Sequence, residues 1–96
     1  MGKIYKDQTY LLLRIELNAP ILNQSQALIK YRKPDGTDGA FLALVTDSSQ
    51  GILEYEPQDG DIDQVGEWTF WGHITYNDDR VIAGEPSKVR IYAEGF

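Results

Sequence analysis

The stretch DGDIDQVGEWTFW, residues 59–71, joins four acids and two glycines to a run of aromatic side chains. Three of the acids stand at alternate positions, Asp59, Asp61 and Asp63. Carboxylates at that spacing converge on calcium in helix-loop-helix sites, but such a loop needs glycine at its sixth position and glutamate at its twelfth. This sequence has Gln64 and Phe70 there. We therefore interpret residues 61–66 as a crossing between two sheets, and a calcium loop of another design, with Glu67 as a fourth oxygen donor, is the alternative.

The residues after this crossing alternate in polarity and predict the strongest strand of the chain. One face of that strand carries Trp68, Phe70, Ile74 and Tyr76, with Gly72 among them. The opposite face carries Thr69, Trp71, His73 and Thr75. A period of two is typical of a strand that buries one face. We expect the Trp68 face to lie in the core.

The same period recurs along the rest of the chain. It predicts further strands over residues 10–17, 27–33, 41–46, 51–55 and 88–94. Pro34-Asp35-Gly36 is typical of a hairpin turn, and Asn77-Asp78-Asp79 of a second turn. No segment repeats apolar residues at helical spacing, since Pro20 interrupts the one candidate. The pattern predicts one all-β domain over residues 1–96: an antiparallel β-sandwich of about seven strands with no long helix.

Composition narrows the classes of function. The chain has 96 residues and no cysteine, which excludes disulfides, thiolate metal sites and cysteine nucleophiles. A net charge of −6 argues against binding to a nucleic acid backbone. The longest apolar runs, such as residues 40–45, are too short to cross a bilayer, and the first residues lack a hydrophobic signal core. We expect a soluble protein that binds neither nucleic acid nor membrane.

The charge is unevenly distributed along the sequence. Residues 34–79 contain eleven acids and no lysine or arginine, whereas the two ends together contain nine basic residues and four acids. If the fold places these stretches on different faces, complementary fields favour ordered assembly of copies or partners. The alternative is a surface that serves only solubility.

The residue types needed for catalysis are scarce. His73 is the only histidine, and no serine has the spacing of a nucleophile elbow or a glycine-rich oxyanion loop beside it. No phosphate-binding loop is present, and as a zinc ligand His73 would have only carboxylate partners. We expect no enzymatic activity, no cofactor and no metal.

Partner binding is better supported, because Trp71 lies on the strand face opposite Trp68. In the expected topology, Trp71 and His73 lie on the outside of a sheet beside Lys30 and Arg32 of a neighbouring strand. Aromatic side chains next to arginine are typical of interface cores. We predict partner binding through Trp71, His73, Lys30 and Arg32. The alternative is that a loop of the same chain covers Trp71.

Residues 63–70, DQVGEWTF, resemble the corner of immunoglobulin-like domains in which an acid, a small residue and an aromatic precede the sixth strand. Trp68 takes the position of the corner tyrosine. Phe70 stands where antibody domains have their second cysteine, so apolar packing replaces the disulfide between the sheets. The resemblance implies an immunoglobulin-like architecture.

Three further blocks, ALIKYRKPDG at 27–36, GILEY at 51–55 and DIDQVGEW at 61–68, resemble small virion domains of tailed phages. Their order is similar to that in the N-terminal β-sandwich domain of phage baseplate upper proteins. The resemblance implies a non-enzymatic structural protein of a tail, baseplate or head, made in the bacterial host cytoplasm and built into the virion. Its partners would be other virion proteins or copies of itself, as a homo-oligomer.

A second class of function is an immunoglobulin-like adhesion or carbohydrate-binding module. In that case Trp71, Tyr76 and Tyr92 would form an aromatic platform for sugar rings. In either class, unpaired edge strands can recruit another chain, and Pro20 or Pro86 is placed to prevent this.

Overall fold

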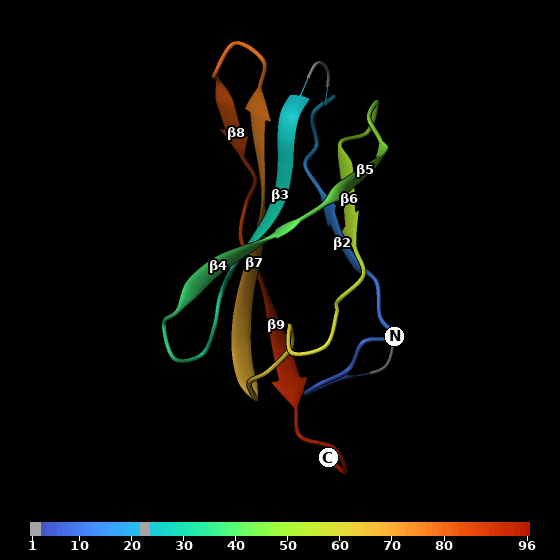
Figure 1. The fold of residues 1–96 in the computed structure, drawn as a ribbon, viewed down its shortest axis with the longest axis vertical. Coiled ribbons are helices and arrows are strands. Elements are labelled where there is room, and N and C mark those ends of the chain that lie inside the picture. The colour runs from blue at the N-terminus through green and yellow to red at the C-terminus, as the bar shows by residue number, and fades with distance from the viewer. Residues whose placement is uncertain (1–2, 22–23) are drawn as a thin grey trace.

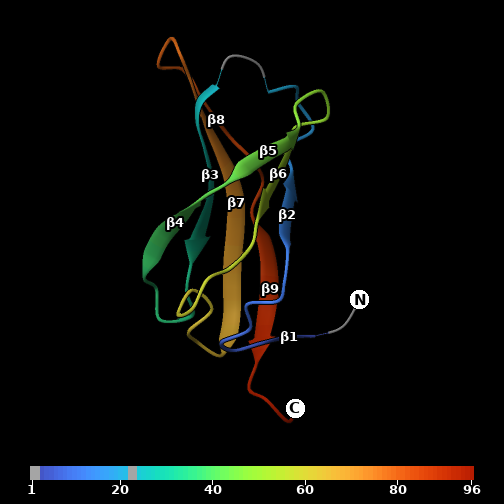
Figure 2. The same ribbon diagram turned by 45° about the vertical axis from the view of Figure 1, so that its right-hand side comes forward.

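Two β-sheets pack face to face (Figures 1 and 2). The computed structural model describes residues 3–21 and 24–96. The strands are β1 (Ile4–Tyr5), β2 (Leu13–Glu16), β3 (Gln24–Arg32), β4 (Asp38–Leu42), β5 (Leu44–Asp47), β6 (Ile52–Tyr55), β7 (Gly66–Tyr76), β8 (Val81–Ala83) and β9 (Ser87–Tyr92). The larger sheet has the order β1-β9-β7-β3-β4, with β8 also paired to β7, and the smaller sheet has the order β2-β6-β5. Within the described ranges, no helix has the length and apolarity to span a membrane.

The predicted fold class is confirmed: the protein is an all-β, immunoglobulin-like antiparallel β-sandwich with no cysteine to cross-link it. Seven strands match the predicted segments, with ends shifted by a few residues. Two short strands, β1 and β8, were not predicted, because two or three residues are too few to show a period. β1 pairs with β9 in parallel, through Ile4 beside Ile91 and Tyr5 beside Tyr92, while the other pairings are antiparallel.

The predicted strand over residues 41–46 is divided between the two sheets. β4 pairs with β3 in the larger sheet, and β5 pairs with β6 in the smaller one. Figure 1 shows the chain running from β4 into β5 across the sandwich. Ala43 lies at the division, is buried, and donates its N–H to the carbonyl of Ala27 at 3.0 Å. The strand therefore closes one side of the sandwich, with Phe41 inside and Leu42 outside.

The central strand β7 has the predicted inward face. Trp68 and Ile74 are fully buried, Phe70 nearly so, and Tyr76 packs partly buried against them. Full burial of an indole ring stabilises the fold by roughly 4–6 kcal/mol as an upper value. The same core receives Ile29 from β3, Leu53 from β6 and Ile91 from β9.

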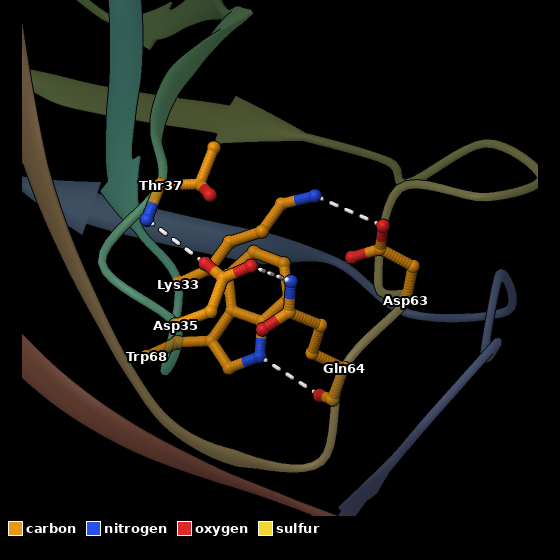
Figure 3. Close-up of polar contacts among 6 residues, drawn as sticks. All are labelled: Lys33, Asp35, Thr37, Asp63, Gln64 and Trp68. Carbon is orange, nitrogen blue, oxygen red and sulfur yellow. Dashed lines mark hydrogen bonds and ion pairs between the residues drawn. The ribbon is translucent and has the colours of Figure 1, made fainter.

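The predicted crossing is the loop that enters β7 from the smaller sheet (Figure 3). Trp68 donates its indole N–H to the carbonyl of Gln64 at 2.9 Å, which is the return bond that a tyrosine makes in immunoglobulin-like corners. The ammonium of Lys33 lies 5.6 Å from the Trp68 ring and 2.9 Å from a carboxylate oxygen of Asp63. Asp35 accepts a hydrogen bond from the Gln64 side chain. The crossing is thus fixed to the β3–β4 hairpin by polar contacts around a buried ring.

Replacing Trp68 with Phe tests this corner. The smaller ring leaves a cavity and removes the donor for the Gln64 carbonyl, so we expect the free energy of unfolding to fall by roughly 1–3 kcal/mol. Trp71→Phe, on the outer face, should cost less than about 1 kcal/mol. Urea unfolding of both variants measures the difference, and equal losses would contradict the assigned roles of the two rings.

Two glycines with positive φ offer a matched comparison of backbone constraint. Gly51 has φ +73° and a Cβ there would collide with the carbonyl oxygen of Ala19, whereas Gly60 has φ +83° and open space around it. Gly60→Ala should cost about 1–2 kcal/mol from the left-handed backbone alone. Gly51→Ala should cost roughly 2 kcal/mol more, because the backbone must also move. Thermal unfolding of the two variants measures the two losses of stability. Equal losses would show that the backbone at Ala19 moves away from the added Cβ at residue 51 without cost.

Candidate interaction surface

The four side chains predicted to bind a partner lie on one face of the larger sheet. Lys30 stands opposite Trp71 in the β3–β7 register, Leu28 opposite His73, and Arg32 opposite Thr69. Residues opposite each other in an antiparallel pair share a face, and that face is the outer one because Trp68 and Phe70 point inward. We call the outward side chains of β3, β4, β7 and β9 around Trp71 the Trp71 face.

Trp71 is half-buried in the outer face of the larger sheet. The guanidinium of Arg32 lies 5.9 Å from the centre of the Trp71 ring, and the same group binds Asp38 at 2.8 and 3.2 Å. Its hydrogen bond and charge interaction with Asp38 raise the pKa of Arg32 and lower that of Asp38. The ion pair therefore holds Arg32 in place beside the aromatic ring.

An apolar extension of this face was not predicted. Leu42 of β4 lies opposite Leu28 of β3, which lies opposite His73 of β7, so the three form one row across the sheet. Leu42 is 69% exposed. In the sequence, Leu42 lies in a continuous apolar run. Such a run shows no alternation of polarity, so the residues that point outward cannot be told from those that point inward.

The Trp71 face also has a charge of its own. It carries Lys30, Arg32, Lys88 and Arg90, and only two acids, Asp38 and Glu67, by the strand registers. Four cations and two anions give +2 on a chain whose net charge is −6. Glu67 lies 3.7 Å from Lys88, and within residues 3–21 and 24–96 no ion pair involves Lys30. Lys30, beside Trp71, is therefore available to an acidic group of a partner.

The acidic crossing loop does not form a cation site. Asp61 accepts hydrogen bonds from the Tyr55 hydroxyl at 2.5 Å and from the Gln58 N–H at 2.7 Å, and Asp63 pairs with Lys33. Burial, followed by the hydrogen bond with Asp61, raises the pKa of Tyr55 to about 12. In the part of the chain that the structure describes, no three acidic or histidine side chains gather as metal ligands would. The structure therefore does not bring Asp59, Asp61, Asp63 and Glu67 together as the ligand set that the calcium alternative needs.

The aromatic platform of the carbohydrate-binding alternative does not form. Tyr76 packs against the core, on the side of the sheet opposite Trp71. Tyr92 lies at the far end of β9, where its ring is 6.4 Å from that of Tyr5 and 4.6 Å from the Lys3 ammonium. Of the three proposed rings, Trp71 stands by itself at the centre of the outer face.

The fold defines the class of protein as an immunoglobulin-like β-sandwich. Among solved structures, the chain is similar to CopC from Methylosinus trichosporium OB3b, with a TM-score of 0.61, 10% identity, and coverage of 100% of this chain and 89% of that chain. At that identity the likeness concerns the fold alone. No protein-family model and no curated protein matches the sequence.

His73 provides a probe of the Trp71 face. Partial burial, followed by the charge of Lys30, holds the pKa of His73 below its ordinary value of 6.5. The folded state therefore takes up the proton later than the unfolded state as the pH falls. The contribution of His73 to stability is complete above pH 6.5 and is lost as the pH falls from there through the folded pKa.

We predict that the only histidine of the chain titrates below 6.5 in the folded protein and that Lys30→Met moves its pKa upward. NMR titration of the imidazole signals measures both values. His73→Gln should flatten the loss of thermal stability just below pH 6.5. An unchanged pKa in Lys30→Met would contradict the closeness of Lys30 to the imidazole.

Proposed function

We propose that this chain is a non-enzymatic structural or assembly protein of a phage or prophage particle, in the tail, the baseplate or the head. It acts through protein–protein contacts at the Trp71 face. The observation that carries the proposal is the composition of that face: a half-buried tryptophan with an arginine beside it, an exposed leucine in the same sheet, and a positive charge on an acidic molecule. Tryptophan and arginine are the residues that contribute most energy to protein interfaces.

The sequence blocks that resemble phage virion domains meet in space. Residues 27–36 form most of β3 and its turn, residues 51–55 form β6, and residues 61–68 form the crossing and the start of β7. Ile29, Leu53 and Trp68, one from each block, belong to the same buried cluster, so the resemblance concerns segments that contribute to the core. This supports an origin among virion β-sandwiches made in a bacterial host cytoplasm and assembled into particles, with other virion proteins or copies of the chain as partners.

The second candidate, an adhesion or carbohydrate-binding module, has less support. One aromatic ring flanked by Arg32 does not provide the row of rings proposed for a sugar chain. The net positive charge of the surface also favours an acidic partner over a neutral glycan.

The test is incorporation into particles. We expect mass spectrometry to find the chain in purified particles induced from the strain that encodes it. Trp71→Ala should reduce the amount of the chain found in particles at least about tenfold, because loss of a central interface tryptophan costs roughly 2 kcal/mol or more. Val65→Ala, at a loop residue that is 47% exposed and outside the Trp71 face, is the matched control and should be incorporated normally.

Absence of the wild-type chain from particles, or full incorporation of folded Trp71→Ala, would contradict the proposal. Binding to a glycan array that is lost in Trp71→Ala would favour the carbohydrate-binding module instead.

A further inference from the structure

Three aspartates of this chain are followed directly by glycine: Asp35, Asp38 and Asp59. At such a step the backbone nitrogen of the glycine can attack the side-chain carbonyl carbon of the aspartate, because glycine has no Cβ to hinder the approach. A C–N bond forms, water leaves, and the product is a five-membered cyclic imide. Water then opens the imide at either carbonyl. Opening at the main-chain carbonyl leaves isoaspartate, in which the main chain runs through the former side chain.

This reaction requires a carboxyl group and a glycine nitrogen that can approach each other. Ring closure is fast only when the reacting atoms reach a distance of about 3–3.5 Å in the correct orientation. A carboxylate held by hydrogen bonds, or a glycine N–H that donates to a carbonyl, must first be released by local opening of the structure. Each of the three aspartates is followed by the same residue type, so differences among them arise mainly from the fold.

The fold holds the Asp35 step at both reacting groups. One carboxylate oxygen of Asp35 accepts the Thr37 N–H at 2.9 Å, and the other accepts the side-chain amide of Gln64 at 2.9 Å (Figure 3). The Gly36 N–H donates to the carbonyl of Lys33 at 2.9 Å. Ring closure at Asp35 therefore disrupts the turn between β3 and β4.

The Asp38 step is held within the larger sheet. The guanidinium of Arg32 binds the two oxygens of the Asp38 carboxylate at 2.8 and 3.2 Å. Gly39 lies in β4 opposite Tyr31, and a Cβ on Gly39 would collide with the Tyr31 ring, so that ring covers this glycine closely. Ring closure at Asp38 therefore requires the start of β4 to leave β3.

The Asp59 step has none of these restraints. Asp59 and Gly60 are the exposed central residues of a turn in which the Asp61 N–H donates to the carbonyl of Gln58 at 3.0 Å. Gly60 has φ +83° and open space around it. Over residues 3–21 and 24–96, the Asp59 carboxylate and the Gly60 N–H make no hydrogen bond or ion pair. The two groups that react are thus available while the ends of the turn stay fixed.

We propose that Asp59 is a modification site, at which the folded chain forms isoaspartate while Asp35 and Asp38 are protected. The product has one additional methylene in the main chain and a carboxylate on Cα. Its charge equals that of aspartate, so the net charge of the chain remains −6. The carboxylate on Cα makes the product a substrate for the class of carboxyl methyltransferases that act on isoaspartate. In that reaction its oxygen takes the methyl group of S-adenosylmethionine, and S-adenosylhomocysteine leaves.

Peptide mapping of the natural chain after prolonged incubation at neutral pH tests the proposal. Electron-transfer dissociation distinguishes isoaspartate from aspartate, which have the same mass, at each of the three positions. We expect isoaspartate at residue 59 to accumulate at least about tenfold faster than at residue 35 or 38, because displacement of reacting groups by an ångström costs that much or more in rate. Accumulation at residue 59 that is no faster than at the other two overturns the proposal.

The same chain unfolded in urea provides the control for the role of the fold. The hydrogen bonds that protect Asp35 and Asp38 are lost there, so the three steps should isomerise at similar rates. A preference for residue 59 that persists unchanged in urea would show that the local sequence, and not the fold, selects the site.

Two variants test the assignment by a second measurement. Asp59→Glu keeps the charge, but attack by the Gly60 nitrogen would then close a six-membered ring, which forms more slowly. Transfer of a labelled methyl group from S-adenosylmethionine by an isoaspartyl methyltransferase should therefore fall to a small fraction in incubated Asp59→Glu. Asp38→Glu is the matched control and should be methylated like the natural chain. Unchanged methylation of Asp59→Glu overturns the proposal. The result is independent of incorporation into particles, so this inference and the assembly function fail separately.

Discussion

The burial of Trp68 at the entry to β7 is the constraint on which the rest of the structure depends. No disulfide joins the sheets, so the ring that fills the space between them must be held by packing and by one hydrogen bond, from its indole N–H to the Gln64 carbonyl. Lys33 lies over the ring and binds Asp63, which ties the crossing loop to the hairpin after β3. The corner thus satisfies a buried polar group and fixes the relative position of both sheets.

The burial of Trp68 also determines which side chains point outward, because successive side chains of a strand point to opposite faces. Once Trp68, Phe70 and Ile74 point inward, Trp71 and His73 must point outward. The register with β3 then places Lys30 and Arg32 beside them. A slip of one residue in β7 would bury Trp71 and expose Trp68, which the polar corner prevents. The candidate interaction surface is therefore a geometric consequence of the core.

The sequence was sufficient for the strands and the buried face because these are encoded by local alternation. Pro34-Asp35-Gly36 was predicted as a hairpin turn, and it joins β3 to β4, with Gly36 at φ +90°. The division at Ala43 was beyond reach, because an uninterrupted apolar run contains no signal for a change of sheet. The parallel contact of β1 with β9 joins residues 87 positions apart, and the joint position of Lys30, Lys88 and Arg90 on one face depends on registers among three strands. Such information is absent from any local window.

The Trp71 face differs in charge from the rest of this acidic molecule. The Trp71 face carries a net positive charge, so association there should weaken with salt as its attraction to an acidic partner is screened. The distribution of charge over the sandwich, more than its total, therefore determines which contacts are strong under given conditions.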